Sequence, residues 1–259
     1  MRHGGQILID QLRIQGVKQV FCIPGESYLP ALDGLYKSDI KTIVCRQEGG
    51  AAMMAEATGK LTGKPGIAFV TRGPGATNAS AGVHIAFQDS TPMILFVGQV
   101  SSSQRDREAF QEVDYKKMFA PLAKWVAEID KTERIPEYIS RAFSIAQSGR
   151  PGPVVLSLPE DILFSKLEIN DAPKVEPPNQ MVSEQNVKEV LNKLSQSLNP
   201  FIIVGGSCWS SKAAINLGIF AKKLGIPVGT SFRCQDYIDN RHPNYAGDVG
   251  IGINPKLLK

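Results

Sequence analysis

The sequence has few of the residues that build metal centres and disulfide frameworks. Among 259 residues there are four cysteines and three histidines, all widely spaced, and no Cys-x-x-Cys pair occurs. Disulfide-held secreted proteins are dense in cysteine, and zinc sites bring cysteine and histidine together at short spacings. The sequence therefore predicts free thiols in a reducing, cytoplasmic setting and no metal ligands of its own.

Long apolar runs and blocks of charge are also missing. No stretch approaches about 18 uninterrupted apolar residues, which excludes a membrane-spanning helix. The formal net charge is +4, and the densest basic pairs, at 116–117 and 222–223, lie in helical patterns. Because phosphate backbones are bound by concentrated basic faces, we expect neither a nucleic acid nor a membrane as a partner.

What the sequence does have is a regular alternation of apolar runs and helical patterns over its first 160 residues. Continuous apolar strands that alternate with helices indicate a parallel sheet covered on both faces. We therefore expect a doubly wound α/β domain at 1–165. Its predicted strands span 19–23, 41–45, 66–70, 93–97, 125–128 and 153–158, and its predicted helices lie near 5–15, 27–37, 48–62, 75–87, 112–118 and 132–147.

After residue 165 the composition changes, which predicts a second domain. Residues 166–182 are polar and proline-rich and predict an extended linker. A partial second α/β domain is then expected at 183–259, with helices over 183–197 and 211–224 and strands over 201–204 and 226–230. Because about 75 residues with two or three strands form a poor core, we expect the chain to be the N-terminal fragment of a longer protein.

The most informative stretch is 44–57, where an apolar run stops at a charged, glycine-rich step and a helix of small residues begins. Glu48 starts this helix at the carboxyl end of a predicted parallel strand, which is where open α/β sheets bind ligands. Taken alone, a glutamate in a first helical turn is explained by the helix dipole. The small residues that follow let a backbone or a flat ligand come close to the helix.

This stretch and three others resemble the pyrimidine-binding domain of thiamine diphosphate enzymes of the acetolactate synthase type. The other three are Phe21-Cys22-Ile23-Pro24-Gly25, residues 70–78, and Gly98-Gln99-Val100 followed by Ala109-Phe110-Gln111-Glu112. They occur in the family's order, and the likeness covers essentially the whole chain. It implies a 2-oxo acid decarboxylase or carboligase, a lyase or transferase that uses thiamine diphosphate and Mg²⁺. Branched-chain amino acid biosynthesis is one pathway for such an enzyme.

The resemblance also implies roles for individual residues. Glu48 would be catalytic, because a glutamate at this position hydrogen-bonds N1′ of the thiamine aminopyrimidine and promotes loss of the thiazolium C2 proton. The cofactor-binding residues expected with it are Pro24, Gly25, Gly73, Pro74, Gly75, Asn78 and Gln111. In the family the diphosphate and Mg²⁺ are held by a third, C-terminal domain, so their ligands are not expected within these 259 residues. The family's central domain holds FAD, ADP or neither, so the Gly205-Gly206-Ser207 turn leaves an FAD site open.

The resemblance further implies a substrate channel lined by Glu26, Ser27, Phe110 and Lys124. Residues 24–27 depart from the family's usual Pro-Gly-Gly, and Ser101 stands where a proline is usual, so the identity of the 2-oxo acid stays open. Two plainer interpretations remain, in which Phe110 is a core anchor and Lys124 is a charge at a strand edge.

Two interpretations from other classes also stay open. The turn at 73–78 looks like the start of an NAD or FAD dinucleotide fingerprint, but Asn78 replaces the third glycine and no acidic residue ends the next strand. The other is a non-catalytic dimerisation module that keeps the fold. Small residues along the helices that begin at Glu48 and Ala76 favour close packing on a second subunit, and thus a homo-oligomer with a shared cofactor site. Tight packing within one chain is the alternative explanation for these small residues.

Overall fold

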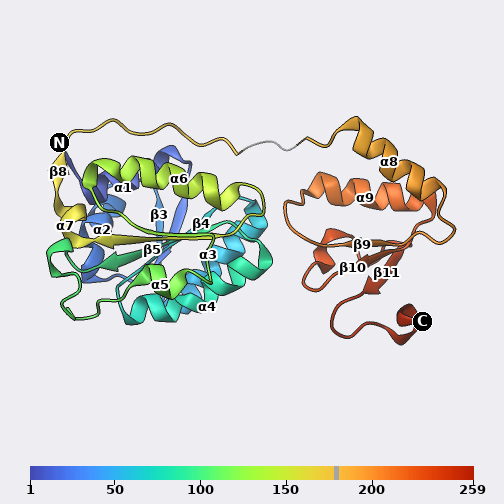
Figure 1. Ribbon diagram of the computed structural model, residues 1–259, viewed down its shortest axis with the longest axis horizontal. Coiled ribbons are helices and arrows are strands. Elements are labelled where there is room, and N and C mark those ends of the chain that lie inside the picture. The colour runs from blue at the N-terminus through green and yellow to red at the C-terminus, as the bar shows by residue number, and fades with distance from the viewer. Residues whose placement is uncertain (178–180) are drawn as a thin grey trace. The chain divides into compact units, whose positions relative to one another are not determined.

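The computed structural model describes residues 1–177 and 181–259. Contacts divide the chain into two compact units, residues 1–178 and 179–259, and both contain helices and strands (Figure 1). The predicted linker over 166–182 includes residues 178–180, which lie outside the described residues.

The first unit is built on a six-stranded sheet with the order β3-β2-β4-β5-β7-β6. Every neighbouring pair is parallel, so all the carboxyl ends lie at one edge. Strands β4, β5 and β7 are buried along their whole length, as strands covered on both faces are. The strands are β2 (Gln19–Cys22), β3 (Lys41–Val44), β4 (Gly66–Val70), β5 (Met93–Gln99), β6 (Trp125–Glu128) and β7 (Pro153–Pro159).

Helices cover both faces of this sheet (Figure 1). One face carries α1 (Gly4–Ile14), α2 (Leu29–Tyr36), α6 (Ile135–Gln147) and α7 (Glu160–Phe164). The other face carries α3 (Glu48–Thr62), α4 (Pro74–Asp89) and α5 (Tyr115–Phe119). The predicted doubly wound α/β fold is therefore confirmed. None of the described helices combines the length and the apolar composition that crossing a membrane requires.

Helix α3 spans the residues that the sequence predicted, and its ends show why. The side chain of Gln47 accepts a hydrogen bond from the Gly50 amide and so caps the first turn. Gly63 closes the last turn with φ +67°, a left-handed conformation that glycine adopts without strain.

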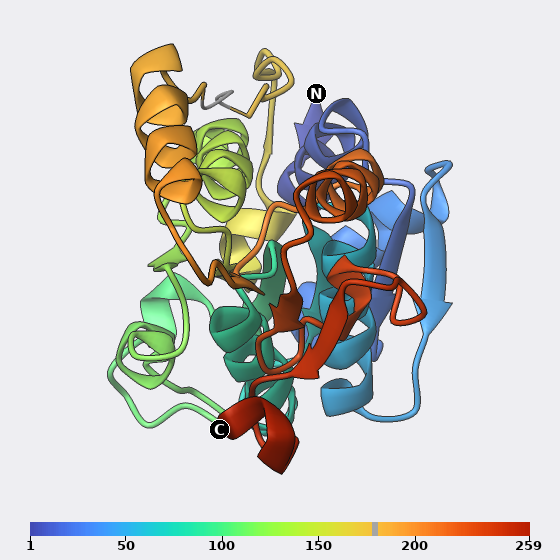
Figure 2. The same ribbon diagram turned by 90° about the vertical axis from the view of Figure 1, so that its right-hand side faces the viewer.

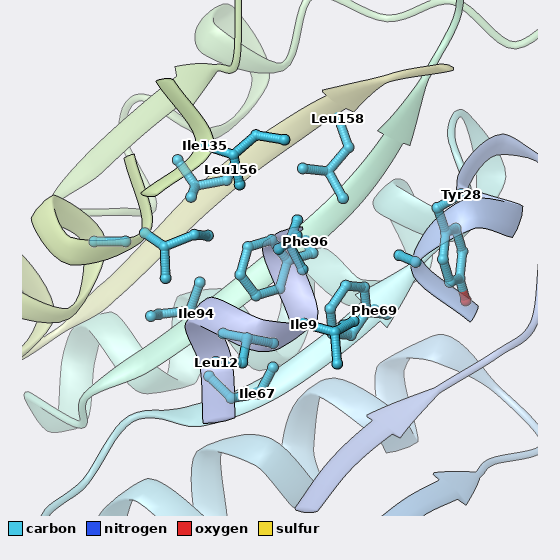
Figure 3. Close-up of a cluster of buried hydrophobic side chains, with 14 of the residues drawn as sticks. Ile9, Leu12, Tyr28, Ile67, Phe69, Ile94, Phe96, Ile135, Leu156 and Leu158 are labelled. Carbon is cyan, nitrogen blue, oxygen red and sulfur yellow. The ribbon is translucent and has the colours of Figure 1, made fainter. Parts of the chain in front are cut away.

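Large apolar side chains fill the core between the sheet and helices α1, α2, α6 and α7 (Figure 3). The Phe69 and Phe96 rings stack with their centroids 4.6 Å apart, and Tyr28 stacks on Phe69 at 5.8 Å. The Tyr28 hydroxyl donates to the Ile23 carbonyl, so the aromatic stack also fixes the end of β2.

On the opposite face, the contact between α3 and α4 is built from small residues. Ala51, Ala52 and Ala55 of α3 are fully buried within the chain. A Cβ on Gly82 of α4 would lie 2.5 Å from the Ala52 Cβ, so the two helices approach as closely as their backbones permit. Tight packing within one chain therefore accounts for these residues, and the expectation that they face a second subunit is wrong for them.

The amino terminus and the segment after α7 contain elements that the sequence analysis did not predict. Strand β1 (Arg2–His3) pairs antiparallel with β8 (Lys166–Leu167). Beyond β8, the Gln11 side chain exchanges two hydrogen bonds with the Ala172 backbone, at 2.9 and 3.0 Å. Gln15 bonds the backbone over 173–175 in the same way. The first part of the predicted linker thus packs on α1, while the predicted domain bounds remain a prediction.

The second unit has a three-stranded parallel sheet with the order β11-β10-β9 (Figure 2). Its core is small and includes Val204, Ala221, Val228 and Ile238. The predicted partial second α/β domain is confirmed, and β11 is an addition to it. The elements are α8 (Glu184–Ser195), β9 (Ile202–Val204), α9 (Ser211–Leu224), β10 (Val228–Thr230), β11 (Tyr245–Asp248) and α10 (Pro255–Leu258).

We predict that Gly82→Ala destabilises the first unit by about 1–3 kcal/mol. The added methyl group meets the Ala52 and Met53 backbones at 2.8–2.9 Å, and this overpacking outweighs a gain in helix propensity of about 1 kcal/mol. Urea unfolding followed by Trp125 fluorescence, in a Trp209→Phe background, reports this unit alone. Gly50→Ala is the matched control, because its Cβ meets no atom within 4 Å. Equal free energies of unfolding for the two variants would contradict the prediction.

A second prediction concerns the thiols. Burial, with a smaller contribution from Cys45, raises the pKa of Cys22 to about 11, and the residue is fully buried at the end of β2. At pH 8 only about one Cys22 in a thousand is a thiolate, the reactive form. We expect iodoacetamide to alkylate the exposed Cys208 in the native protein and Cys22 only after unfolding. Peptide mass spectrometry measures both rates, and native labelling of Cys22 at the Cys208 rate would refute the expectation.

Candidate functional site

The residues predicted to bind a ligand gather at the carboxyl edge of the six-stranded sheet. From β2 the chain runs outward to β3 and then returns to the other side of β2 as β4. The connection from β2 leads to one side, and the connection from β3 leads back to the other side of β2, so the strand order reverses between β2 and β4. Open α/β sheets bind ligands at such a point. Residues 24–27 follow β2, and residues 71–75 follow β4.

These two turns are in direct contact. A Cβ on Gly25 would lie 2.6 Å from the Thr71 Cβ, so a glycine permits the close approach. The Ser27 hydroxyl lies 2.8 Å from the Thr71 hydroxyl and accepts a hydrogen bond from the Arg72 amide at 3.3 Å. Ser27 is buried between these two turns, whereas Glu26 is exposed to solvent. Of these two predicted channel residues, only Glu26 is therefore open to a ligand in the described structure.

Gly73 forms the entry to α4 in a conformation that favours glycine, with φ +60° and ψ −114°. Its amide donates to the Tyr115 hydroxyl at 2.8 Å. Burial raises the pKa of Tyr115 to about 12, so this hydroxyl stays protonated and neutral. Within the described residues no side chain caps the first turn of α4, and the amides at a helix start attract an electron-rich ligand.

Glu48 and Asn78 are brought together from two helices. The Asn78 Nδ2 donates to Glu48 Oε2 at 3.0 Å, which joins the start of α3 to the start of α4. Among the described residues, Glu48 Oε1 accepts no hydrogen bond. A Cβ on Gly50 would meet no atom within 4 Å, so the backbone beside the carboxylate is open. This arrangement suits a flat ligand that carries an N–H donor.

The loop after β5 adds Gln111 to the same place. A Cβ on Gly73 would lie 2.8 Å from the Gln111 Cβ, so the Gln111 side chain starts directly over the Gly73 turn. The neighbouring Phe110 is 80% exposed. The interpretation of Phe110 as a core anchor is therefore wrong, and its ring is free at the rim of the site.

Lys124 lies elsewhere. It precedes β6 at the amino edge of the sheet, and its Nζ donates to the carbonyls of Ile145 and, at 2.8 Å, Ser148 at the end of α6. Burial lowers the pKa of the Lys124 amine. The structure does not bring this residue together with the others, and its place in a substrate channel stays a prediction.

The sequence analysis missed two charged groups at this edge. Arg72 pairs through Nη1 with Glu160 at the start of α7, and this ion pair spans the end of β5, which lies between β4 and β7. Glu112 accepts hydrogen bonds from backbone amides of the loop that carries Phe110. Arg72 lies within the stretch 70–78, and Glu112 ends the stretch 109–112. For Arg72, a charged residue directly before a glycine turn could have indicated a role at this edge.

In the second unit the Gly205-Gly206-Ser207 turn is held by aromatic residues. Trp209 Nε1 donates to the Gly205 carbonyl at 3.1 Å, and the Tyr237 hydroxyl donates to the Gly206 carbonyl at 2.9 Å. A cavity of about 330 Å³ in this unit is lined mainly by α9 and residues 236–242. It contains none of the motif residues, so it does not identify a reaction.

Comparisons with known proteins agree with this geometry. A family model described as "Thiamine pyrophosphate enzyme, N-terminal TPP binding domain" matches residues 2–118. A second, described as "Thiamine pyrophosphate enzyme, central domain", matches residues 187–258. These matches give no support to the dinucleotide-binding interpretation.

Curated relatives are named as acetolactate synthases. The probable acetolactate synthase large subunit of Methanocaldococcus jannaschii is 36% identical over 255 residues, which are 96% of this chain and 43% of the relative. The acetolactate synthase large subunit of Lactococcus lactis subsp. lactis is 38% identical over 264 residues, covering 96% of this chain and 46% of the relative. The isozyme 2 large subunit of Escherichia coli K12 is 32% identical over 249 residues, covering 96% and 45%.

The chain thus spans less than half the length of the curated relatives it matches. Both family matches lie in the units that the structure shows, the first over strands β2 to β5 of the six-stranded sheet and the second over the three-stranded sheet. On these matches, and on a glycine-rich carboxylate site at the sheet edge, the chain belongs to the family of thiamine pyrophosphate enzymes.

Proposed function

We propose that this chain is the N-terminal part of a thiamine diphosphate-dependent, acetolactate synthase-like enzyme that decarboxylates a 2-oxo acid and transfers or releases the remaining group. The observation that carries the proposal is the Glu48 carboxylate, held by Asn78 through one oxygen and open at the other. The names of the relatives support the same reaction class.

The residues present fit the aminopyrimidine part of this cofactor. Glu48 Oε1 offers an acceptor to a ring nitrogen that carries a proton. The open side of Gly50 leaves room for a flat ring against the backbone. The Gly73 turn lies against Gln111, and this contact contains no charged group. This combination of one carboxylate and bare backbone suits a planar, weakly basic heterocycle.

When bound, thiamine diphosphate supplies a nucleophilic thiazolium carbon and an acceptor for the electrons released by decarboxylation. The chain's own contribution is to hold and share a proton at Glu48 Oε1. Asn78 orients the carboxylate by donating to Oε2, so that Oε1 points to one position. Proton sharing of this kind requires an ionisable group at a fixed place.

Other residues are proposed to shape the surroundings of the reacting atoms. Residues 24 and 25 form the turn beside Thr71 and would contact the cofactor. Phe110 and Glu26 are exposed at the rim and would meet the 2-oxo acid or its acceptor. The Glu26 carboxylate is a charged group in place of bare backbone, which supports a substrate with a polar group.

The remaining cofactors and partners rest on the family alone. Mg²⁺ and the ligands of the diphosphate are proposed to lie outside these 259 residues, and FAD in the second unit remains an alternative to an empty central domain. We also propose a cytoplasmic homo-oligomer with a shared site. Supporting this, Val44, Met53 and Met54 near Glu48 are 64%, 44% and 39% exposed in the single chain, which leaves apolar surface beside the carboxylate.

The proposal predicts that Glu48→Gln lowers turnover by about 10²–10⁴-fold, because glutamine keeps the size but cannot share the proton. The assay is 2-oxo acid consumption by the full-length protein that contains this chain, with thiamine diphosphate and Mg²⁺. Glu184→Gln is a matched control, since Glu184 begins α8 just as Glu48 begins α3. If the dipole were the whole role of Glu48, both variants would lose a little stability and neither would lose turnover.

A further prediction is that the isolated 259-residue chain binds thiamine diphosphate weakly, with a Kd well above about 1 µM. The groups that would hold the diphosphate and its metal are proposed to lie in a third domain, and they supply most of the charge-based affinity. Isothermal titration calorimetry with and without Mg²⁺ measures this. Micromolar, Mg²⁺-dependent binding to the isolated chain would show that the diphosphate site is contained within it.

A further inference from the structure

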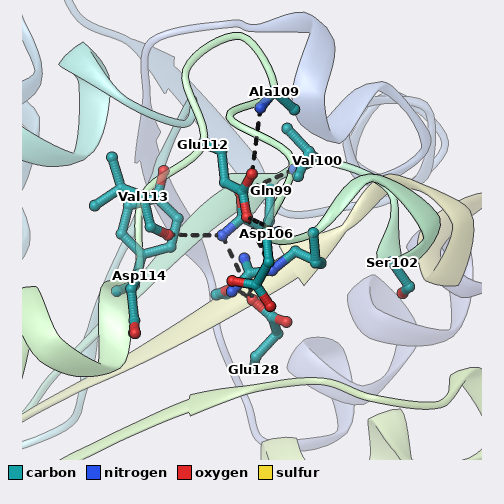
Figure 4. Close-up of polar contacts among 12 residues, drawn as sticks. Gln99, Val100, Ser102, Asp106, Ala109, Glu112, Val113, Asp114 and Glu128 are labelled. Carbon is teal, nitrogen blue, oxygen red and sulfur yellow. Dashed lines mark hydrogen bonds and ion pairs between the residues drawn. The ribbon is translucent and has the colours of Figure 1, made fainter.

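One carboxylate, that of Glu112, binds the backbone of the loop that carries Phe110 and Gln111 at two points (Figure 4). Glu112 Oε1 accepts a hydrogen bond from the Asp106 amide at 2.9 Å, and Oε2 accepts one from the Ala109 amide at 3.3 Å. These amides, that of Asp106 foremost, hold the pKa of Glu112 below its usual value. One side chain therefore fixes the loop backbone both before and beside Phe110.

We call the two hydrogen bonds from the Asp106 and Ala109 amides to Glu112 the clamp, and the conformation of the loop backbone requires it. Asp106, Glu108 and Gln111 have φ values of +60°, +53° and +66°. Non-glycine residues rarely adopt this region, and it persists only where the surrounding contacts impose it. Three such residues occur within six positions, so the loop conformation depends on its hydrogen bonds and not on local preference.

Arg105 connects the clamp to the sheet. Its guanidinium lies 3.5 Å from the Glu112 carboxylate and 3.0 Å from Glu128 Oε2 at the end of β6. Glu128 also accepts a hydrogen bond from the Ser157 hydroxyl of β7 at 2.8 Å. Gln99, the last residue of β5, donates to the Val113 carbonyl at 2.9 Å. Gln99 of β5 and Glu128 of β6 thus hold the two ends of the loop, and Ser157 of β7 supports Glu128; Gln99 and Glu128 are labelled in Figure 4.

We propose that Glu112 and Arg105 are positioning residues that set where Phe110 and Gln111 stand over the Gly73 turn, and thereby select the substrate. Gln111 contacts the Gly73 backbone closely, and the neighbouring Phe110 side chain is 80% exposed. A ring held at a fixed position admits some 2-oxo acid side chains and excludes others, whereas a mobile ring discriminates little. The selection role rests on the proposed function, but the clamp does not.

Amide hydrogen exchange in the 259-residue chain tests the clamp without any assay of activity. Glu112→Gln removes the charge and one acceptor oxygen, so we expect the amides of residues 106 and 109 to exchange about 10–100-fold faster. Glu108→Gln is the matched control in the same loop, and it should leave both amides unchanged. Unchanged exchange in Glu112→Gln overturns the clamp.

Kinetics in the full-length protein test the selection of substrate. With thiamine diphosphate and Mg²⁺, we expect Glu112→Gln to raise KM about tenfold with little change in kcat, because the reacting groups at Glu48 stay in place. The ratio of kcat/KM for pyruvate to that for 2-oxobutyrate should also move toward one. Faster exchange with wild-type KM and an unchanged ratio overturns the selection role.

Two further outcomes separate the possible failures. If the wild-type protein turns over no 2-oxo acid, the proposed function fails, and the exchange data still decide the clamp. If Glu112→Gln does not fold, as Trp125 fluorescence in the Trp209→Phe background would show, Arg105→Lys takes its place. Lysine keeps the charge but loses the planar fork that reaches both carboxylates, so the same changes are expected at smaller size. Wild-type behaviour of a folded Arg105→Lys protein in both measurements contradicts the proposal for Arg105.

Discussion

The close approach of α3 and α4 is the constraint on which the site depends. Gly82 has no side chain, so Ala52 can lie against its backbone, and the two helices start side by side. Only at this separation can the short Asn78 amide reach the Glu48 carboxylate, at 3.0 Å. Larger residues along either helix would add apolar burial but would part the two groups. The small residues therefore contribute more to geometry than to stability.

Much of the fold could be predicted because its pattern is strong and local. Strands such as 66–70 are apolar throughout and alternate with helices, which leaves a covered parallel sheet as the consistent solution. Glu48 was singled out because a strand end, a charge and a run of small residues coincide there in a stretch that resembles a known family, and its catalytic role stays a prediction. The turn at 73–78 reached the same edge by the parallel topology alone, since every carboxyl end lies there.

Other parts depend on contacts that no local pattern shows. Ser27 was predicted to face the substrate, but its hydroxyl fills the space beside Gly98, where a Cβ would lie 1.9 Å from it. Lys124 was placed in the substrate channel by the resemblance, yet its amine donates to carbonyls at the end of α6, which follows it in sequence. Glu112 binds two amides of its own loop, and it is linked to β6 only through Arg105, which also pairs with Glu128. Such long-range polar contacts depend on how the strands and helices pack in three dimensions. That packing is set by many residues acting together and not by any one local pattern.

The strand order also governs when each part of the site can form during folding. In the described structure β6 joins the sheet through β7, although β6 comes first along the chain. Strands β2 to β5, with the Glu48 and Gly73 turns, can therefore assemble while residues 153–159 are still unpaired. Contacts over such sequence distances form late because of the loop entropy they cost. We therefore expect Glu128 to reach Arg105 only after β7 has paired, so that the Glu48–Asn78 contact can form before the loop at 105–113 is fixed.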